Sequence, residues 1–248
     1  MPATFVNTSK QYLSLVTTGS GTGAVVTQGL VLDFTSGSVL TVAAWVKLKD
    51  TNLDYCVLAK NQDSYANGAY VLRYNKDTNM IDWTVNTYTG CWTASVAAPA
   101  NVTTASSGNL IIAQWNNTGC SVSVNNGAFV SATTQANIAP ENKQFTGTAH
   151  DSVAIDQHQF TIGYDPTNPN ATYMNGQIGS VGVWNRLLTA TEMTTLYNSG
   201  TPLLFTSLAG AQGGCAAFWD LDLDALDDNQ FGYNLTNNAS VAFAAAWV

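Results

Sequence analysis

The chain has 248 residues and a net charge of −8, and only 10% of its residues are charged, against roughly 25% in an average soluble domain. Its surface must therefore be covered largely by Thr, Ser, Asn and Gln. The eight basic residues are scattered rather than clustered, which argues against a nucleic-acid partner. No apolar run approaches the ~20 residues that span a bilayer, so we expect no membrane insertion.

Strand signals separated by turn clusters recur at the spacing of a β-sandwich. Asn67-Gly68 and Asn126-Gly127 carry the signature of type I′ hairpin turns, whose two central residues need positive φ. Residues 70–85 predict one amphipathic hairpin with its turn at 76–79. Its first strand places Val71 and Arg73 on one face and Leu72 and Tyr74 on the other.

Three segments predict long excursions from the strands. The first covers residues 86–109 and is rich in small residues, the second runs from Ala132 to Gln157, and the third from Asp165 to Thr172. Long loops on a rigid sandwich commonly carry recognition. The sequence does not say which of these loops does so.

Residues 176–200 predict a strand, a tight turn and one short helix. A β-branched run surrounds Trp184, as in a buried strand. Thr189 and Glu192 have the spacing of a capping box, and Met193, Leu196 and Tyr197 then share one helical face. Gly200 is expected to close the helix.

The segment NGQIGSVGVWNRLLTATEMTTLYNSG, at 175–200, resembles the closing motif of laminin-G-like, concanavalin A-like jelly rolls. Further similar segments are residues 5–15, Leu40–Lys47, Tyr70–Arg73, Val122–Gly127 and Phe160–Gly163. The resemblance covers about residues 4–205. It implies an all-β, two-sheet antiparallel jelly-roll sandwich with one short helix near 189–199.

The resemblance divides the chain into a jelly-roll domain at 1–205 and a C-terminal part at 206–248. The latter contains strand-like stretches that resemble the opening of another such domain, and it ends in the apolar, uncharged run 242–248. Because an apolar end is a poor terminus to leave in water, we expect a strand-forming appendage. It would pack on the sandwich or on a neighbouring subunit.

The four cysteines, Cys56, Cys91, Cys120 and Cys215, are spaced too widely for a metal knuckle. They are either free, half-buried thiols or form one or two disulfides. If a disulfide forms, Cys91 and Cys120 are the preferred pair, since both follow a Thr-Gly dipeptide.

Catalytic residues are not expected. The glucanases of the resembling family use an E-x-D-x-x-E or E-x-D-x-E strand, and this chain has only Glu141 and Glu192, which match neither pattern. His150 and His158 lie beside aspartates, but no nucleophile motif accompanies them. We interpret both as exposed loop histidines and predict a protein that is not an enzyme.

The sequence identifies no cofactor and no metal ligands. The run Asp220–Asp224 predicts a half-exposed strand, with Trp219, Leu221 and Leu223 on the face opposite the three Asp. A Ca²⁺ site completed by another loop is the alternative, since hard cations take clustered carboxylates. Other loop residues, Asp63, Asp165 and Asn168, lie where the resembling family sometimes binds Ca²⁺.

Sugar binding requires aromatic platforms beside polar groups. Tyr65, Tyr88 and Trp92 lie at or near expected loops with polar neighbours, and they are either a glycan platform or loop packing. The remaining strand tryptophans are expected in the core: Trp45, Trp83, Trp115 and Trp184.

Two hypotheses for function follow. The first is a non-enzymatic virion surface protein, a capsid decoration or fibre-type adhesin. It would assemble with other virion proteins or copies of itself, and a host-surface glycan is its candidate ligand. The N-terminus lacks a signal-peptide pattern, the surface is sparsely charged, and similar jelly rolls with such tails occur among phage structural proteins. The alternative is a secreted, extracellular carbohydrate-binding module of a cell-surface protein.

Overall fold

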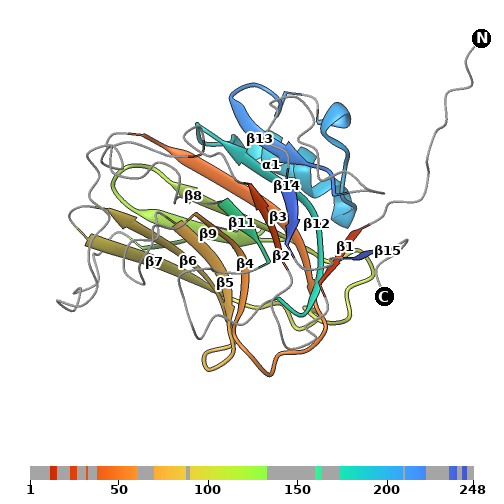
Figure 1. The fold of residues 1–248 in the computed structure, drawn as a ribbon. Coiled ribbons are helices and arrows are strands. Elements are labelled where there is room, and N and C mark those ends of the chain that lie inside the picture. Colours follow the sequence, from red (N-terminus) through yellow and green to blue (C-terminus); the bar gives the residue numbers. More distant parts are fainter. Residues whose placement is uncertain are drawn as a thin grey trace, which may run out of the picture.

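The computed structural model describes residues 12–15, 23–26, 32, 38–60, 70–87, 90–132, 160–163, 174–208, 210–221, 235–238 and 242–244. Within these residues the chain forms two antiparallel β-sheets packed face to face, with one short α-helix (Figure 1). The predicted all-β sandwich is therefore confirmed. None of the described helices is long and apolar enough to cross a membrane.

Sheet A contains eight of the described strands. Seven lie in the order β10, β9, β8, β3, β12, β1, β15, and β13 pairs with β12 beside β1. Their bounds are β1 Tyr12–Leu15, β3 Leu40–Leu48, β8 Asn109–Trp115, β9 Cys120–Val124, β10 Val130–Ala132, β12 Gly176–Trp184, β13 Cys215–Trp219 and β15 Ala242–Ala244.

Sheet B contains seven described strands in the order β14, β2, β11, β4, β5, β6, β7. Their bounds are β2 Gly23–Val26, β4 Tyr55–Lys60, β5 Tyr70–Asn75, β6 Met80–Thr87, β7 Gly90–Ala97, β11 Phe160–Ile162 and β14 Leu235–Asn238.

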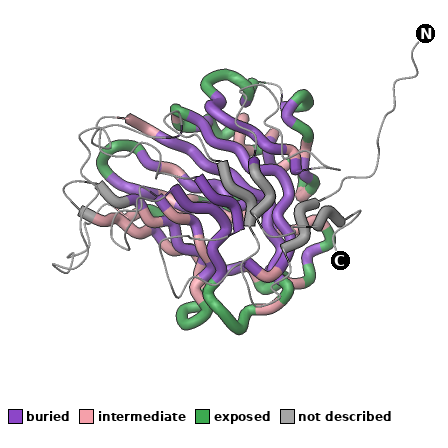
Figure 2. Tube along the Cα trace, in the orientation of Figure 1, coloured by how far each residue is buried: buried purple, intermediate pink, exposed green. Residues whose placement is uncertain are grey.

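The main core lies between the two sheets, where strand residues are buried while connections reach the surface (Figure 2). Trp83 on β6 is fully buried and donates its indole N–H to the carbonyl oxygen of Gln114 on β8, at 3.0 Å. This bond joins the two sheets. The four tryptophans predicted for the core are all buried, at 7% exposure or less: Trp45, Trp83, Trp115 and Trp184.

The strands after residue 206 pair with strands of the sandwich. Strand β13 pairs with the C-terminal half of β12, where Trp219 lies opposite Val181. Strand β1 pairs with the N-terminal half of the same strand, where Leu13 lies opposite Ile178. Strand β14 pairs with β2, and β15 pairs with β1. The C-terminal part thus contributes strands to both sheets.

The prediction of a long loop at 86–109 is wrong over its first half, because residues 90–97 form strand β7, which pairs with β6. Trp92, Ala94 and Val96 alternate toward the core, and small residues occupy the other positions. Small residues weaken the local strand signal. Pairing along the whole of β6 supplies the stabilisation that local propensity lacks.

Two predicted turns have different outcomes. The 76–79 turn is confirmed between β5 and β6. The turn after β9 lies one residue earlier than predicted, because Asn125 and Asn126 have the positive φ values, 53° and 58°. The Asn125 side chain accepts from Leu110 N at 3.0 Å and donates to Asn109 at 2.7 Å, which holds a conformation that Asn tolerates. Asn67-Gly68 lies outside the described residues.

Helix α1, at Ala190–Tyr197, has the predicted capping box between Thr189 and Glu192. It ends earlier than predicted, because Asn198 adopts the left-handed conformation and caps it. The Asn198 side chain also donates to Thr201 O at 3.1 Å. Short 3-10 turns follow at Asn198–Gly200 and Phe205–Ser207.

Candidate functional site

The middle of the outer face of sheet A is apolar and covered. Ala43 and Trp45 of β3 and Leu110 and Ile112 of β8 point away from the main core and form a second buried cluster. Helix α1, the residue Leu188 before it and the segments 203–208 and 211–218 pack on them. The buried members of this cover are Leu188, Leu196, Phe205, Leu208, Ala211, Cys215 and Phe218. This face therefore has little surface left for a ligand.

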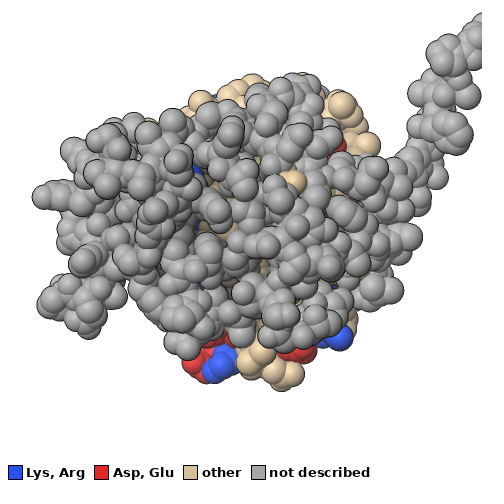
Figure 3. Space-filling model, in the orientation of Figure 1, with Lys and Arg blue, Asp and Glu red and all other residues tan. Residues whose placement is uncertain are grey.

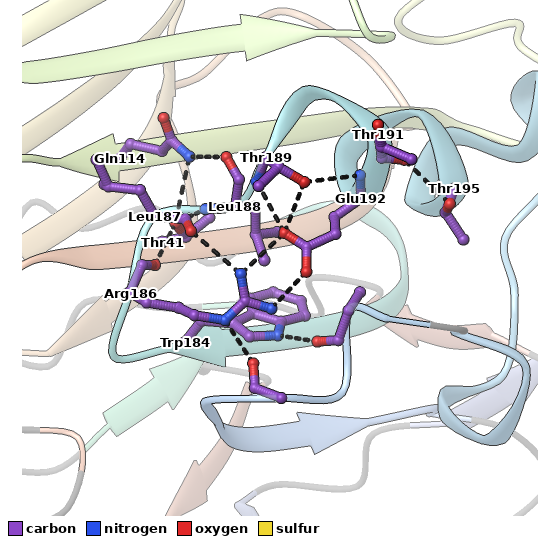
Figure 4. A network of polar contacts seen from close by, with 12 residues as sticks. Thr41, Gln114, Trp184, Arg186, Leu187, Leu188, Thr189, Thr191, Glu192 and Thr195 are labelled. Carbon is purple, nitrogen blue, oxygen red and sulfur yellow. Dashed lines mark hydrogen bonds and ion pairs between the residues drawn. The ribbon is translucent and has the colours of Figure 1, made fainter.

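A polar network fixes α1 to this face (Figure 4). The Arg186 guanidinium donates to both Glu192 oxygens at 2.7 and 2.8 Å and to Gly213 O at 2.5 Å. Glu192 also accepts from the Thr189 backbone N–H and hydroxyl. Its pKa falls to about 2, mainly because Arg186 stabilises the charged carboxylate. Glu192 therefore serves the helix rather than proton transfer.

The β3–β4 connection is held by a smaller polar cluster. Asp50 accepts from the Tyr55 hydroxyl and, at 2.9 Å, from the Asn175 amide. Burial and the Asp50 carboxylate raise the pKa of Tyr55. Figure 3 shows acidic and basic side chains together along the lower edge of the view, where Figure 1 draws the β3–β4 and β5–β6 connections. We interpret the contacts of Asp50 with Tyr55 and Asn175 as stabilising the β3–β4 connection.

The outer face of sheet B is different, because its middle is polar and partly open. In β5, Tyr70, Leu72 and Tyr74 are buried, and the residues between them point outward. The cross-strand register extends this outward set over β6 and β7: Val71, Arg73, Asn75, Met80, Asp82, Thr84, Cys91, Thr93, Ser95 and Ala97. All of these except Asp82 are at least partly exposed, and the apolar Met80 and Ala97 lie at the end of the face beside the β5–β6 turn.

Asp82 is the centre of this face and is only 4% exposed. Ser95 donates to its Oδ1 at 2.7 Å, and Asn75 donates to its Oδ2 at 3.1 Å. Arg73 approaches the same Oδ2 at 3.5 Å. One row along the strands, the Thr84 and Thr93 hydroxyls are hydrogen-bonded at 3.0 Å. The face is thus a preordered array of hydroxyl, amide, carboxylate and guanidinium groups.

The sequence pattern separated Arg73 from Leu72 and Tyr74 across the strand, and the structure confirms this alternation, but the pattern did not identify the array. Three other members of the array, Asp82, Thr84 and Asn75, belong to the predicted hairpin, where alternation alone does not say which face is turned to solvent. Thr93 and Ser95 were missed because β7 was interpreted as a loop.

Of the three aromatic residues predicted as ligand platforms, only Trp92 lies in the described part of the chain. It lies on β7 rather than in a loop and faces the core side of the strand, paired with Val85. Its ring is half-buried and packs on Trp115 with ring centroids 5.1 Å apart. Tyr65 and Tyr88 lie outside the described residues.

None of the four cysteines, all of which are described, forms a disulfide. The preferred pair is separated by the β7 strand, because Cys91 lies on the outer face near the Thr93 hydroxyl. Cys120 belongs to the core and contacts the Trp83 carbonyl oxygen. Burial raises the pKa of Cys120 to about 12.

No group of three His, Cys, Asp or Glu side chains that could hold a metal occurs among the residues described. The predicted strand through Asp220–Asp224 is wrong at Leu221, which is fully buried with φ of 50°. Asp220 instead accepts from Phe205 N at 2.8 Å. The remainder of this run, 222–224, lies outside the described residues. So do the other candidate metal ligands and the two histidines: Asp63, Asp165, Asn168, His150 and His158.

The sequence matches a family model over residues 18–194, more than half of the chain. This is the Laminin_G_3 family of the concanavalin A-like lectin/glucanases superfamily. The chain belongs to it. No curated protein matches the sequence.

Several solved structures share the fold. A native heptameric SAP-like pentraxin from Limulus polyphemus is 10% identical, with a TM-score of 0.52, covering 94% of this chain and 93% of that one. Domains LG4-5 of the mouse laminin α1 chain are 13% identical, with a TM-score of 0.48, covering 71% and 42%. The NanB sialidase of Streptococcus pneumoniae is 14% identical, with a TM-score of 0.49, covering 75% and 27%. At 10% identity the likeness to the pentraxin shows the fold alone.

Proposed function

We propose that this protein is a non-enzymatic glycan-binding adhesin and that the outer face of β5, β6 and β7 is its binding face. One observation carries the proposal. Among the described residues, the middle of the outer face of sheet A is apolar and is covered by α1 and by the segments 203–208 and 211–218. The middle of the opposite outer face is polar and partly exposed.

The chemistry of this face suits a saccharide. Sugar rings present hydroxyl groups that both donate and accept hydrogen bonds, and the face offers hydroxyls, amides and a carboxylate. The network around Asp82 orders these side chains before a ligand arrives, which lowers the entropic cost of binding. With about 4.8 Å between strands and about 6.8 Å between alternate residues, three strands and three rows cover about 10 by 14 Å.

The carboxylates support a binding role rather than that of a retaining glycosidase. A retaining glycosidase needs two carboxyl groups about 5–5.5 Å apart. On the face as described, Asp82 is the sole carboxylate, and both its oxygens accept hydrogen bonds. Glu192 is bound to Arg186 on the other sheet. Glu141 lies outside the described residues.

We further propose that the protein acts on the surface of a virion, in contact with other virion proteins or with copies of itself. The sparse charge and the Thr- and Asn-rich composition support a protein exposed on a particle. Mass spectrometry of purified particles tests the location, and light scattering of the purified protein tests self-association. Absence from particles, together with secretion by the producing cell, would favour the alternative of a secreted carbohydrate-binding module.

A glycan array tests the binding role. The wild type is compared with Thr84→Phe, which places a bulky ring at the middle of the face while keeping a residue that strands tolerate. Thr195→Phe makes the same change on α1, at a position that is partly exposed like Thr84. We expect Thr84→Phe to lose binding at least tenfold and Thr195→Phe to retain it. Silence of the wild type across the array would overturn the proposal, as would equal binding by Thr84→Phe. Repeating the array in EDTA tests for a Ca²⁺ requirement.

A further inference from the structure

Arg73 distinguishes the polar face from a neutral array of hydroxyls and amides. It lies on β5, on the face that is turned away from the core, directly across from Asp82. Its side chain is 44% exposed. Among the described outward residues of β4 to β7 it is the sole cation.

The protein uses little of the hydrogen-bonding capacity of this guanidinium, which has five N–H donors. The described residues provide it with one contact, from Nη2 to Asp82 at 3.5 Å, which is long for a hydrogen bond. Its Nε is enclosed and has no hydrogen-bond partner in the part of the chain that the structure describes. Arg186 is the contrast, since that guanidinium makes four contacts, including both oxygens of Glu192. The described residues therefore satisfy the hydrogen-bonding groups of Arg186 but not those of Arg73.

Asp82 does not need Arg73 to be held in place. Ser95 and Asn75 already donate to its two oxygens at 2.7 and 3.1 Å. The Asp82 charge is therefore stabilised by shorter bonds than the one to Arg73. The exposed amino groups of Arg73 can turn to an incoming anion without leaving Asp82 unpaired.

We propose that the ligand of this face is an acidic saccharide whose carboxylate is bound by Arg73. The proposal rests on the glycan-binding function above and names the class of glycan. A guanidinium presents two parallel N–H donors that match the two oxygens of a carboxylate. The Thr84 and Thr93 hydroxyls lie one row away, about 7 Å along the strands, where they meet the ring hydroxyls of the same or the next sugar.

Calorimetric titration with matched ligands tests the inference. The probes are sialyllactose and a trisaccharide containing a hexuronate, each compared with its carboxyl-reduced, neutral form. Wild type should bind the acidic form at least tenfold more tightly, and added salt should reduce this preference because Arg73 is partly exposed.

Variants assign the preference to one side chain. Arg73→Gln should abolish the preference for acidic over neutral forms, and Arg73→Lys should retain only part of it because Lys lacks the planar fork. Lys76→Gln is the matched control, since it removes one positive charge from the turn of the same hairpin, and it should bind like wild type. Retained neutral-sugar binding by Arg73→Gln shows that the face is still folded.

The outcomes separate the two proposals. Equal affinity for acidic and neutral forms would overturn the acidic ligand while leaving the glycan-binding function in place. Binding of neither form to wild type would overturn both. A preference for the acidic form that persists in Arg73→Gln would overturn the assignment of the carboxylate to Arg73.

Discussion

Replacing Glu192 with Gln tests the polar network that fixes α1 to sheet A. Glu192→Gln keeps the shape of the side chain and removes its charge. The wild-type carboxylate accepts from Arg186 at 2.7 and 2.8 Å and from Thr189 N at 2.8 Å. The variant retains one acceptor oxygen and presents an amide N–H₂ to a guanidinium that has no acceptor. The ion pair is lost, and one guanidinium contact becomes repulsive.

The pKa of Glu192 sets the magnitude. A pKa lowered from 4.5 to about 2 corresponds to an upper limit of roughly 3 kcal/mol. The Glu192 and Arg186 side chains are 14% and 28% exposed, so water and salt screen the pair. We therefore expect Glu192→Gln to lower the free energy of unfolding at pH 7 by about 1–2 kcal/mol.

The same pKa fixes the pH dependence. Because the folded-state pKa is below the unfolded value, the stabilisation is complete above pH 4.5 and is lost as the pH falls toward 2. Urea unfolding followed by tryptophan fluorescence should show a gap between wild type and Glu192→Gln at pH 7. At pH 2.5 that gap should be below about 0.5 kcal/mol.

Asp77→Asn is the matched control, since Asp77 is paired with Lys76 but is 75% exposed. It should change stability by less than about 0.5 kcal/mol. A gap for Glu192→Gln that is constant from pH 7 to pH 2.5 would refute the electrostatic reasoning. An effect of Asp77→Asn as large as that of Glu192→Gln would refute the role of burial.

Two further substitutions or treatments test the packing. Gly182→Ala should lower the free energy of unfolding by about 1–3 kcal/mol in a urea titration, because its new methyl group would lie 2.7 Å from the buried Phe218 ring and against the Trp184 ring. Gly213→Ala, which meets no atom within 4 Å, should be neutral. Burial raises the pKa of Cys120 to about 12, so iodoacetamide at pH 8 should label this thiol only after the protein is unfolded. Mass spectrometry measures the labelling, and labelling of Cys120 in the native protein would contradict its burial.

Local sequence patterns predict the parts of this fold that are stabilised locally. The capping box at Thr189 is satisfied within four residues, and the 70–85 hairpin closes on itself through a short turn. Strand β7 is different, because its Thr, Ala and Ser residues gain their stability from pairing with β6. The pairing of β14 with β2 joins residues far apart in the chain, and no local pattern specifies such a partner.

The candidate site was only partly predictable for the same reason. Alternation puts Arg73 on one side of its strand, but it does not say which side faces solvent or what lies across from it. Asp82 comes into contact with Arg73 through the register of β5 with β6, and Ser95 comes into contact with Asp82 through the register of β6 with β7. The three aromatic candidates were chosen as exposed loop residues, and Trp92 belongs to a strand whose side chains alternate between core and surface.

The two outer faces show how one sandwich fold can be closed on one side and open on the other. At outward positions β3 carries Ala43 and Trp45, so sheet A needs a cover, and the helix with its Arg186–Glu192 pair provides it. At equivalent outward positions sheet B carries Asp82 and Thr84, which tolerate water. Because both sheets already bury their inner faces in the shared core, these outward residues contribute less to the fold. They are therefore the positions at which a binding surface can be built or altered at the lowest cost in stability.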